Sequence, residues 1–239
     1  MTATTPRSAY WLGVRDGLPF LLVVGPFALL FGVVSAEAGL DMVQILAFSV
    51  AVFAGASQFT ALQLMVDNVP TLIVVTTALA VNLRMAMYSA ALTPYLGQAP
   101  LWQRVFIAYL VVDQSYACAI ARFEENTGWP MPVRVAYFLG AISPVYPVWL
   151  GTSVLGAWLG TAIPDWLGLD FAVPLCFLAI IGPMLRTVAH VAAAATSVVL
   201  ALALIWLPFS LGLLVAAVAA MAVGAQVELW QARRARRQA

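Results

Sequence analysis

The chain has 239 residues, of which 64% are hydrophobic and 9% are charged, and its formal net charge at pH 7 is +1. Soluble domains are typically about 45–50% apolar and about 25% charged, so a soluble globular domain is the weak alternative to a membrane protein. The small net charge argues against nucleic acid as a partner. The mean hydropathy of +0.98 favours an all-α, polytopic integral membrane protein in a lipid bilayer.

Apolar stretches in the sequence are long enough to cross a bilayer as helices, which takes about 20 residues each. In chain order the expected segments are 18–36, 42–66, 70–93, 102–122, 133–163, 170–186, 188–207 and 209–231. Residues 1–17 precede them and a basic tail, 232–239, follows them, all within one transmembrane domain. Seven segments is the alternative count, because the sixth and seventh are short and are divided only by Arg186.

The arginines predict which loops lie in the cytoplasm, since positive residues gather there near the ends of membrane segments. Arg7 and Arg15 precede the first segment, and the tail 233–237 reads RRARR. With eight segments both termini are cytoplasmic, and Arg104 is the exception on the opposite side. The N-terminus lacks the pattern of a cleavable signal peptide, so the first apolar segment is expected to remain.

Proline and glycine interrupt several of the expected segments. Pro26 lies in the first, Gly55 in the second and Pro144 in the fifth, which is also too long for a straight span. Proline removes a backbone donor and kinks or breaks a helix, and transporters build midplane binding sites from broken helices. The alternative is close helix packing through small residues, which we favour for Gly156 and Gly160, while both interpretations stay open for Pro26 and residues 55–58.

Polar residues lie deep inside three of the apolar segments. Asn82 and Arg84 are near the middle of the third, Asp113 and Gln114 are at the middle of the fourth, and Gln58 is just past the middle of the second. A charge at the bilayer centre costs roughly 2.5–3.5 kcal/mol on insertion scales. Because residues far apart in sequence share one depth, we expect them to form a site between helices.

A structural role for these groups is the alternative. Arg84 and Asp113 would then be an ion pair that joins the third and fourth segments, and the amides would be hydrogen-bonding contacts between helices. A buried ion pair adds little net stability because desolvation opposes the Coulomb attraction. The functional interpretation is therefore favoured for the two charges.

Other titratable residues give no sign of a metal or cofactor. Cys118 and Cys176 fall in apolar segments without CxxC or Cys/His spacing and are interpreted as small core residues. His190 is the single histidine and lies near the start of the seventh segment, where an interfacial position is the preferred interpretation. No metal site and no cofactor are expected.

Four stretches carry a resemblance to a known family. In chain order they read PFALLFGVVSAEAGL, VFAGASQFTALQL, VNLRMAMYSAALTPYL and VVDQSYACA. Their order and spacing resemble the AzlC family, the large subunits of bacterial branched-chain amino-acid exporters. The likeness covers most of the chain, roughly residues 13–177. It depends on the Gly-Ala-x-Gln-Phe and Asn-Leu-Arg elements together, since neither is specific alone.

The resemblance implies a function that composition does not. Family members export valine, leucine, isoleucine or methionine across the bacterial inner membrane, with a small membrane subunit of the AzlD type. Two positions depart from the family pattern. Met85 stands where the family often has His, and Gln114 stands where it often has Glu. If those groups carry coupling protons, this chain has lost two candidates, and either Asp113 carries the proton, or the coupling differs, or the substrate differs.

These expectations combine into a secondary exporter. Arg84 or free helix N–H groups would bind the carboxylate of an amino acid, and Asp113 or backbone carbonyls would bind its ammonium group. Proton antiport would need Asp113, because arginine stays protonated. The expected substrate-binding or coupling residues are Arg84, Asn82, Asp113, Gln58, Gln114, Ser57, Gly55 and Pro26.

Two other functions are alternatives to export. An intramembrane enzyme would use Ser57, Ser115 or Asp113, but the sequence lacks GxSxG, HExxH and paired-aspartate motifs, so no enzymatic activity is expected. An accessory membrane subunit without transport activity is the other alternative, and the buried charges count against it.

Overall fold

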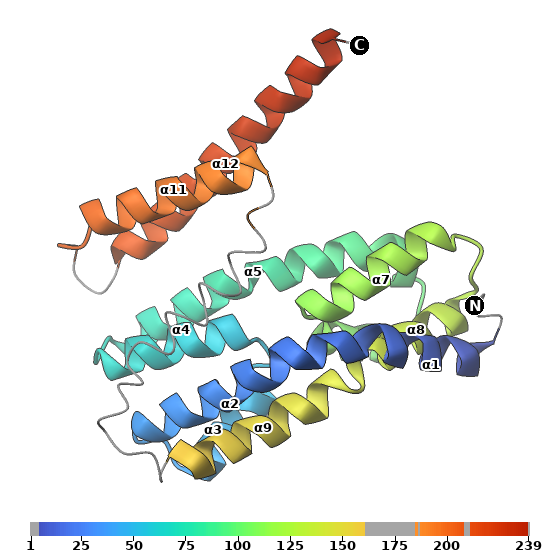
Figure 1. The fold of residues 1–239 in the computed structure, drawn as a ribbon, viewed down its shortest axis with the longest axis horizontal. Coiled ribbons are helices and arrows are strands. Elements are labelled where there is room, and N and C mark those ends of the chain that lie inside the picture. Colours follow the sequence, from blue (N-terminus) through green and yellow to red (C-terminus); the bar gives the residue numbers. More distant parts are fainter. Residues whose placement is uncertain (1–4, 161–184, 186, 208–210, 239) are drawn as a thin grey trace. The chain divides into compact units, whose positions relative to one another are not determined.

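The computed structural model describes residues 5–160, 185, 187–207 and 211–238, and their regular structure is entirely helical (Figure 1). The chain divides into two compact units, residues 1–169 and 170–239, which are treated separately below. The all-α fold is confirmed. Apart from Leu185, the predicted sixth segment lies outside the described residues, as do Cys176 and Arg186.

The first helical stretch begins earlier than the sequence suggested. It comprises α1 (Pro6–Gly17), the 3₁₀ turn η1 (Leu18–Phe20) and α2 (Leu21–Glu37). A capping box starts α1: the Thr5 hydroxyl accepts from the Ser8 backbone N–H and the Ser8 hydroxyl accepts from that of Thr5. The helix therefore includes most of residues 1–17, which had been assigned to a terminal segment.

At Pro26 the sequence left open a kinked or broken helix and close packing, and the structure shows no break there. The helix α2 continues through Pro26, whose side chain is exposed. Along its length α2 packs against α9 (Val145–Gly160), and this packing holds the helix together despite the missing backbone donor. The interruption expected at Pro144 is confirmed, because α8 (Met131–Ile142) ends just before it and α9 begins just after it.

Glycines form the seam between these two helical stretches, which run parallel, with α1 beside α8 and α2 beside α9 (Figure 1). A Cβ on Gly13 would collide with the backbone oxygen of Tyr137, and a Cβ on Gly140 with that of Tyr10. The same reciprocity is found further along, where Gly156 lies against the Leu29 carbonyl and Gly32 lies against the Ser153 carbonyl. The contacts follow a repeat that the sequence analysis missed, AYWLG at 9–13 and AYFLG at 136–140.

The second and fourth predicted segments are each broken into two helices. The second consists of α3 (Met42–Ala51) and α4 (Gly55–Val66), and the fourth of α6 (Leu101–Leu110) and α7 (Asp113–Glu125). Between them runs the unbroken α5 (Thr71–Leu96). The break before Gly55 agrees with the sequence, whereas the break before Asp113 was not foreseen.

The break at 111–112 contains neither proline nor glycine. Ser115 stabilises it with its hydroxyl, which accepts from the Val112 N–H at 2.9 Å and lies 3.2 Å from the Leu110 carbonyl oxygen. The side chain is 1% exposed, so these contacts replace backbone hydrogen bonds inside the protein.

Three described helical stretches are long and apolar enough to cross a membrane, and they are Pro6–Glu37, Thr71–Leu96 and Met131–Gly160. The second unit holds α11 (Val188–Ala203) packed beside α12 (Leu211–Gln238). Helix α12 continues into the basic tail, so most of 232–239 is helical rather than a separate segment. The total of eight spans stays a prediction.

Candidate functional site

Arg84 and Asp113 form the ion pair that their shared depth suggested. Arg84 Nη1 lies 3.2 Å from Asp113 Oδ2, which joins the middle of α5 to the first residue of α7. Tyr88, one turn after Arg84, donates its hydroxyl to Asp113 Oδ1 at 2.7 Å. The Tyr88 ring stacks on Tyr116 with 4.3 Å between centroids. Both carboxylate oxygens are thus engaged, by groups that hold Asp113 against α5.

The helix break explains why a carboxylate is stable at this position. Asp113 is the first residue of α7, where the helix dipole presents its positive end and the backbone N–H groups lack intrahelical acceptors. The side chains of Arg84 and Asp113 are 28% and 39% exposed. The pair is therefore anchored on one side and accessible on the other, which suits a charged site that exchanges partners.

An apolar cleft lies between α4 and α5, and among the described residues that line it is Asn82 but neither Arg84 nor Asp113. Its volume is about 590 Å³, and Asn82 and Ser57 are among the polar residues on its wall. The Asn82 side-chain oxygen is buried and has no hydrogen-bond partner among the described residues, and the same holds for Arg84 Nε. Ser57 donates to the Ala78 carbonyl at 3.0 Å, so its hydroxyl is already satisfied.

The remaining predicted residues lie elsewhere. Gln58 is fully buried, and its Nε2 lies 3.4 Å from the Ser49 hydroxyl of α3. Gly55 provides a close packing contact, since an added Cβ would lie 2.7 Å from both the Phe27 and the Trp149 rings. Gln114 follows Asp113 and is half-buried, and Pro26 faces outward. No hydrogen bond in the described part of the chain joins Gln58 or Gln114 to the ion pair.

One tyrosine that the sequence analysis did not single out connects the two broken helices. Tyr109, in the last turn of α6, donates its hydroxyl to the Val50 carbonyl of α3 at 2.6 Å. Its oxygen also lies 2.9 Å from the hydroxyl of Tyr146, at the start of α9. The chain interruptions at 52–54 and 111–112 are therefore close in space.

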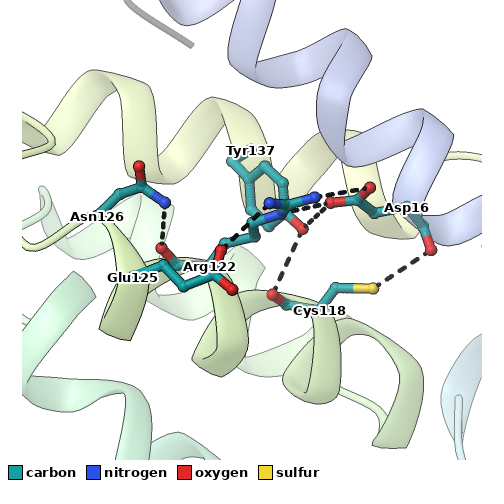
Figure 2. Close-up of polar contacts among 6 residues, drawn as sticks. All are labelled: Asp16, Cys118, Arg122, Glu125, Asn126 and Tyr137. Atoms are coloured by element: carbon teal, nitrogen blue, oxygen red, sulfur yellow. Dashed lines mark hydrogen bonds and ion pairs between the residues drawn. The ribbon is translucent and has the colours of Figure 1, made fainter. Parts of the chain in front are cut away.

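A second polar cluster lies at the other end of α7 (Figure 2). Arg122 holds Asp16 through two contacts, Nε to Oδ2 at 2.8 Å and Nη2 to Oδ1 at 3.3 Å. Tyr137 of α8 donates to the same Oδ2 at 2.7 Å, and Cys118 Sγ lies 3.6 Å from the Asp16 backbone oxygen. Glu125 accepts from Arg122 Nη1 at 3.2 Å.

Sequence reasoning missed this cluster because Arg122 and Asp16 lie near the predicted ends of segments. Charges there are commonly solvated. Arg84 and Asp113 were recognised because each is a charge in the middle of an apolar run, and this pattern is absent at Arg122 and Asp16. Only the three-dimensional packing of α1, α7 and α8 brings the groups together.

Comparisons with known proteins identify the family of the chain. The sequence model of the family described as AzlC protein matches residues 19–163, which include α2 through α9. The chain belongs to the AzlC family. The matched range contains Arg84, Asp113, Arg122 and Tyr137, whereas Asp16 and the helices of the second unit lie outside it.

Individual AzlC-family relatives are membrane proteins by name. The chain is 25% identical over 175 residues to the inner membrane protein YgaZ of Escherichia coli, covering 68% of each chain. It is 29% identical over 224 residues to an uncharacterized membrane protein of Archaeoglobus fulgidus, covering 92% of this chain and 95% of that one. No solved structure matches the chain. The chain is thus an AzlC-family membrane protein.

Proposed function

We infer that the chain is a secondary transporter that exports branched-chain or other small apolar amino acids across the bacterial inner membrane. The observation that carries the proposal is the Arg84–Asp113 pair at the start of the half-helix α7. Charges among membrane-spanning helices are functional by default, and transporters place substrate sites where helices are interrupted.

The pair has the chemistry that an amino-acid zwitterion needs. A bound substrate would present its carboxylate to Arg84 and its ammonium group to Asp113, so each charge keeps an opposite partner. Asp113 would retain its hydrogen bond from Tyr88 during this exchange. Because Asp113 can be protonated and arginine cannot, export by proton antiport would also use Asp113.

The cleft between α4 and α5 supports selection of an apolar side chain. Its wall is mostly aliphatic, with Val74, Val75 and Ala78 among the lining residues, and its volume of about 590 Å³ is more than one leucine side chain fills. Asn82 is on this wall, and its buried oxygen, which has no hydrogen-bond partner among the described residues, could accept from the substrate's ammonium group.

A partner subunit is part of the proposal. Only 11% of the most apolar stretch of α5 is buried, and the ion pair that joins α5 to α7 is partly exposed. Such charges need a water-filled cavity or a covering protein surface in a bilayer. A small multispanning subunit of the AzlD type, which the family resemblance implies, would supply that surface.

An intramembrane enzyme receives no support from the candidate serines. Ser57 donates to the Ala78 carbonyl, and Ser115 is fixed in the helix break by contacts to Leu110 and Val112. Neither hydroxyl contacts a base in the described residues, which a serine nucleophile requires.

The test of the proposed function is transport by the purified protein, with and without its partner, in proteoliposomes. Vesicles loaded with labelled valine, leucine or methionine are diluted, and the label remaining inside is followed in time. The proposal expects saturable efflux of at least one of these solutes, chemically unchanged. If vesicles that contain the protein and its partner lose label no faster than loaded vesicles without protein, the proposal is refuted.

A further inference from the structure

The cluster at the end of α7 lines an open cavity that the proposed site does not use. Its volume is about 540 Å³, and its polar wall includes Arg15, Asp16, Arg122 and Glu125. The apolar part of the wall is formed by Pro19, Phe20, Ala117 and Ala121. Two cationic and two anionic side chains thus face one space that also offers apolar surface.

We propose that this cavity is a second binding site for an amino-acid zwitterion, separate from the Arg84–Asp113 site. The inference deepens the proposed function and rests on it, since it names the site where the same substrate first binds. By the orientation predicted from the arginines, this end of the unit faces the cytoplasm.

Charge balance selects a zwitterion over other ligands. Without ligand, the Arg122 guanidinium holds both oxygens of Asp16, and Tyr137 adds a third hydrogen bond. An amino acid brings a carboxylate for Arg122 together with an ammonium group for Asp16 or Glu125. A simple anion would take Arg122 from Asp16 and a simple cation would leave Arg122 with Glu125 alone, whereas a zwitterion replaces both partners of the pair at once.

Binding here would also act on the first site through α7. Arg122 and Asp113 are both on α7, and the break at 111–112 separates this helix from α6. Arg122 fixes the far end of α7 to α1, while Asp113 fixes its start to α5. A ligand that replaces Asp16 at Arg122 loosens the far end, and a short rigid helix transmits that change to Asp113.

Cys118 provides a built-in probe, because it lines the cavity and its sulfur lies next to the Asp16 backbone. With Cys176→Ser, Cys118 is the single thiol of the chain. The experiment measures the rate at which N-ethylmaleimide alkylates Cys118 in membranes at rising valine concentration. If the occupied cavity does not react, the rate falls by the factor 1 + [valine]/Kd, about tenfold at nine times Kd.

Ligand and residue controls separate this site from a general effect of solute. N-acetylvaline lacks the ammonium group and isobutylamine lacks the carboxylate, so neither is expected to slow alkylation. Arg122→Gln is expected to abolish protection by valine, and the matched variant Arg104→Gln, on α6, is expected to keep it. Protection is also expected to persist when Arg84 and Asp113 are both replaced by Leu.

Failure of this proposal is distinguishable from failure of the proposed function. Valine efflux without valine protection of Cys118, or protection that disappears in the Arg84→Leu/Asp113→Leu variant, would overturn the second site and leave transport intact. If Cys118 reacts too slowly to follow, equilibrium binding of labelled valine to that double variant decides. Binding of valine at one site per chain, lost on adding Arg122→Gln, supports the proposal. Absence of valine binding to the double variant contradicts it.

Discussion

Removing one member of the Arg84–Asp113 pair should destabilise the protein more than removing both. At 3.2 Å and an effective dielectric constant near 20, the Coulomb attraction is about 5 kcal/mol before desolvation is subtracted. Breaking a fully buried pair costs about 3–5 kcal/mol and breaking an exposed one about 0–1 kcal/mol. With side chains 28% and 39% exposed, we place the cost of Arg84→Gln between these limits, at about 2 kcal/mol.

The assay is thermal unfolding in mild detergent, followed by the amount of monodisperse protein that survives heating. A loss of about 2 kcal/mol predicts a midpoint roughly 4–8 °C below the parent. Arg84→Leu combined with Asp113→Leu should recover most of that loss, since an apolar replacement of a buried pair is often neutral. Asp113→Asn serves as the control that keeps an acceptor for Tyr88. A double variant as unstable as the single one would refute this energetic reasoning.

Three further predictions follow from the fold. Gly156→Ala should lower the thermal midpoint because its Cβ would collide with a backbone carbonyl, whereas Gly151→Ala, with open space around it, should leave the midpoint equal or higher. Tyr109→Phe should cost about 1 kcal/mol and slow efflux by freeing the Val50 carbonyl, and Tyr146→Phe, which keeps that bond, should have the smaller effect. Reporter fusions should place both chain ends in the cytoplasm, and a periplasmic C-terminus would favour seven spans.

The partner prediction is tested separately, by purification in mild detergent. The chain should co-purify with a small multispanning membrane protein, because α5 is little buried and the ion pair that joins it to α7 is partly exposed, and lipid does not accommodate such charges. Full efflux activity from the chain alone, in a host without such a partner, would contradict this expectation.

The sequence predicted the ion pair because burial of charge in an apolar run is costly and therefore informative. Arg84 and Asp113 stood out for that reason, and the structure pairs Arg84 of α5 with Asp113 of α7. Tyr88 did not stand out, because a tyrosine in an apolar segment has many uses. Its role depends on the helical spacing from Arg84 and on the position of Asp113.

Helix interruptions were predicted only where backbone chemistry demands them. Pro144 marked a real break, but Pro26 did not, because packing along α9 maintains α2. The break before Asp113 depends on a serine that satisfies its own local backbone, and such hydrogen bonds have no distinctive composition.

The glycine seam was predicted in part. Packing was the favoured role for Gly156 and Gly160, and both lie against α2. The reciprocal contact of Gly13 and Gly140 was not predicted, because it depends on two stretches more than a hundred residues apart running parallel. The Asp16–Arg122 cluster was not predicted for the same reason, since it joins three helices that are distant in sequence.

The most direct test of the central claim is efflux by the Arg84→Leu/Asp113→Leu variant, normalised to the folded protein in the membrane. If the pair binds the substrate, the variant loses two charge-assisted contacts of about 1.5–3 kcal/mol each, and efflux should fall by about 100-fold or more while the protein still folds and inserts. Near-normal efflux of the parent's substrate by the folded double variant would show that Arg84 and Asp113 only join α5 to α7, and that the substrate binds elsewhere.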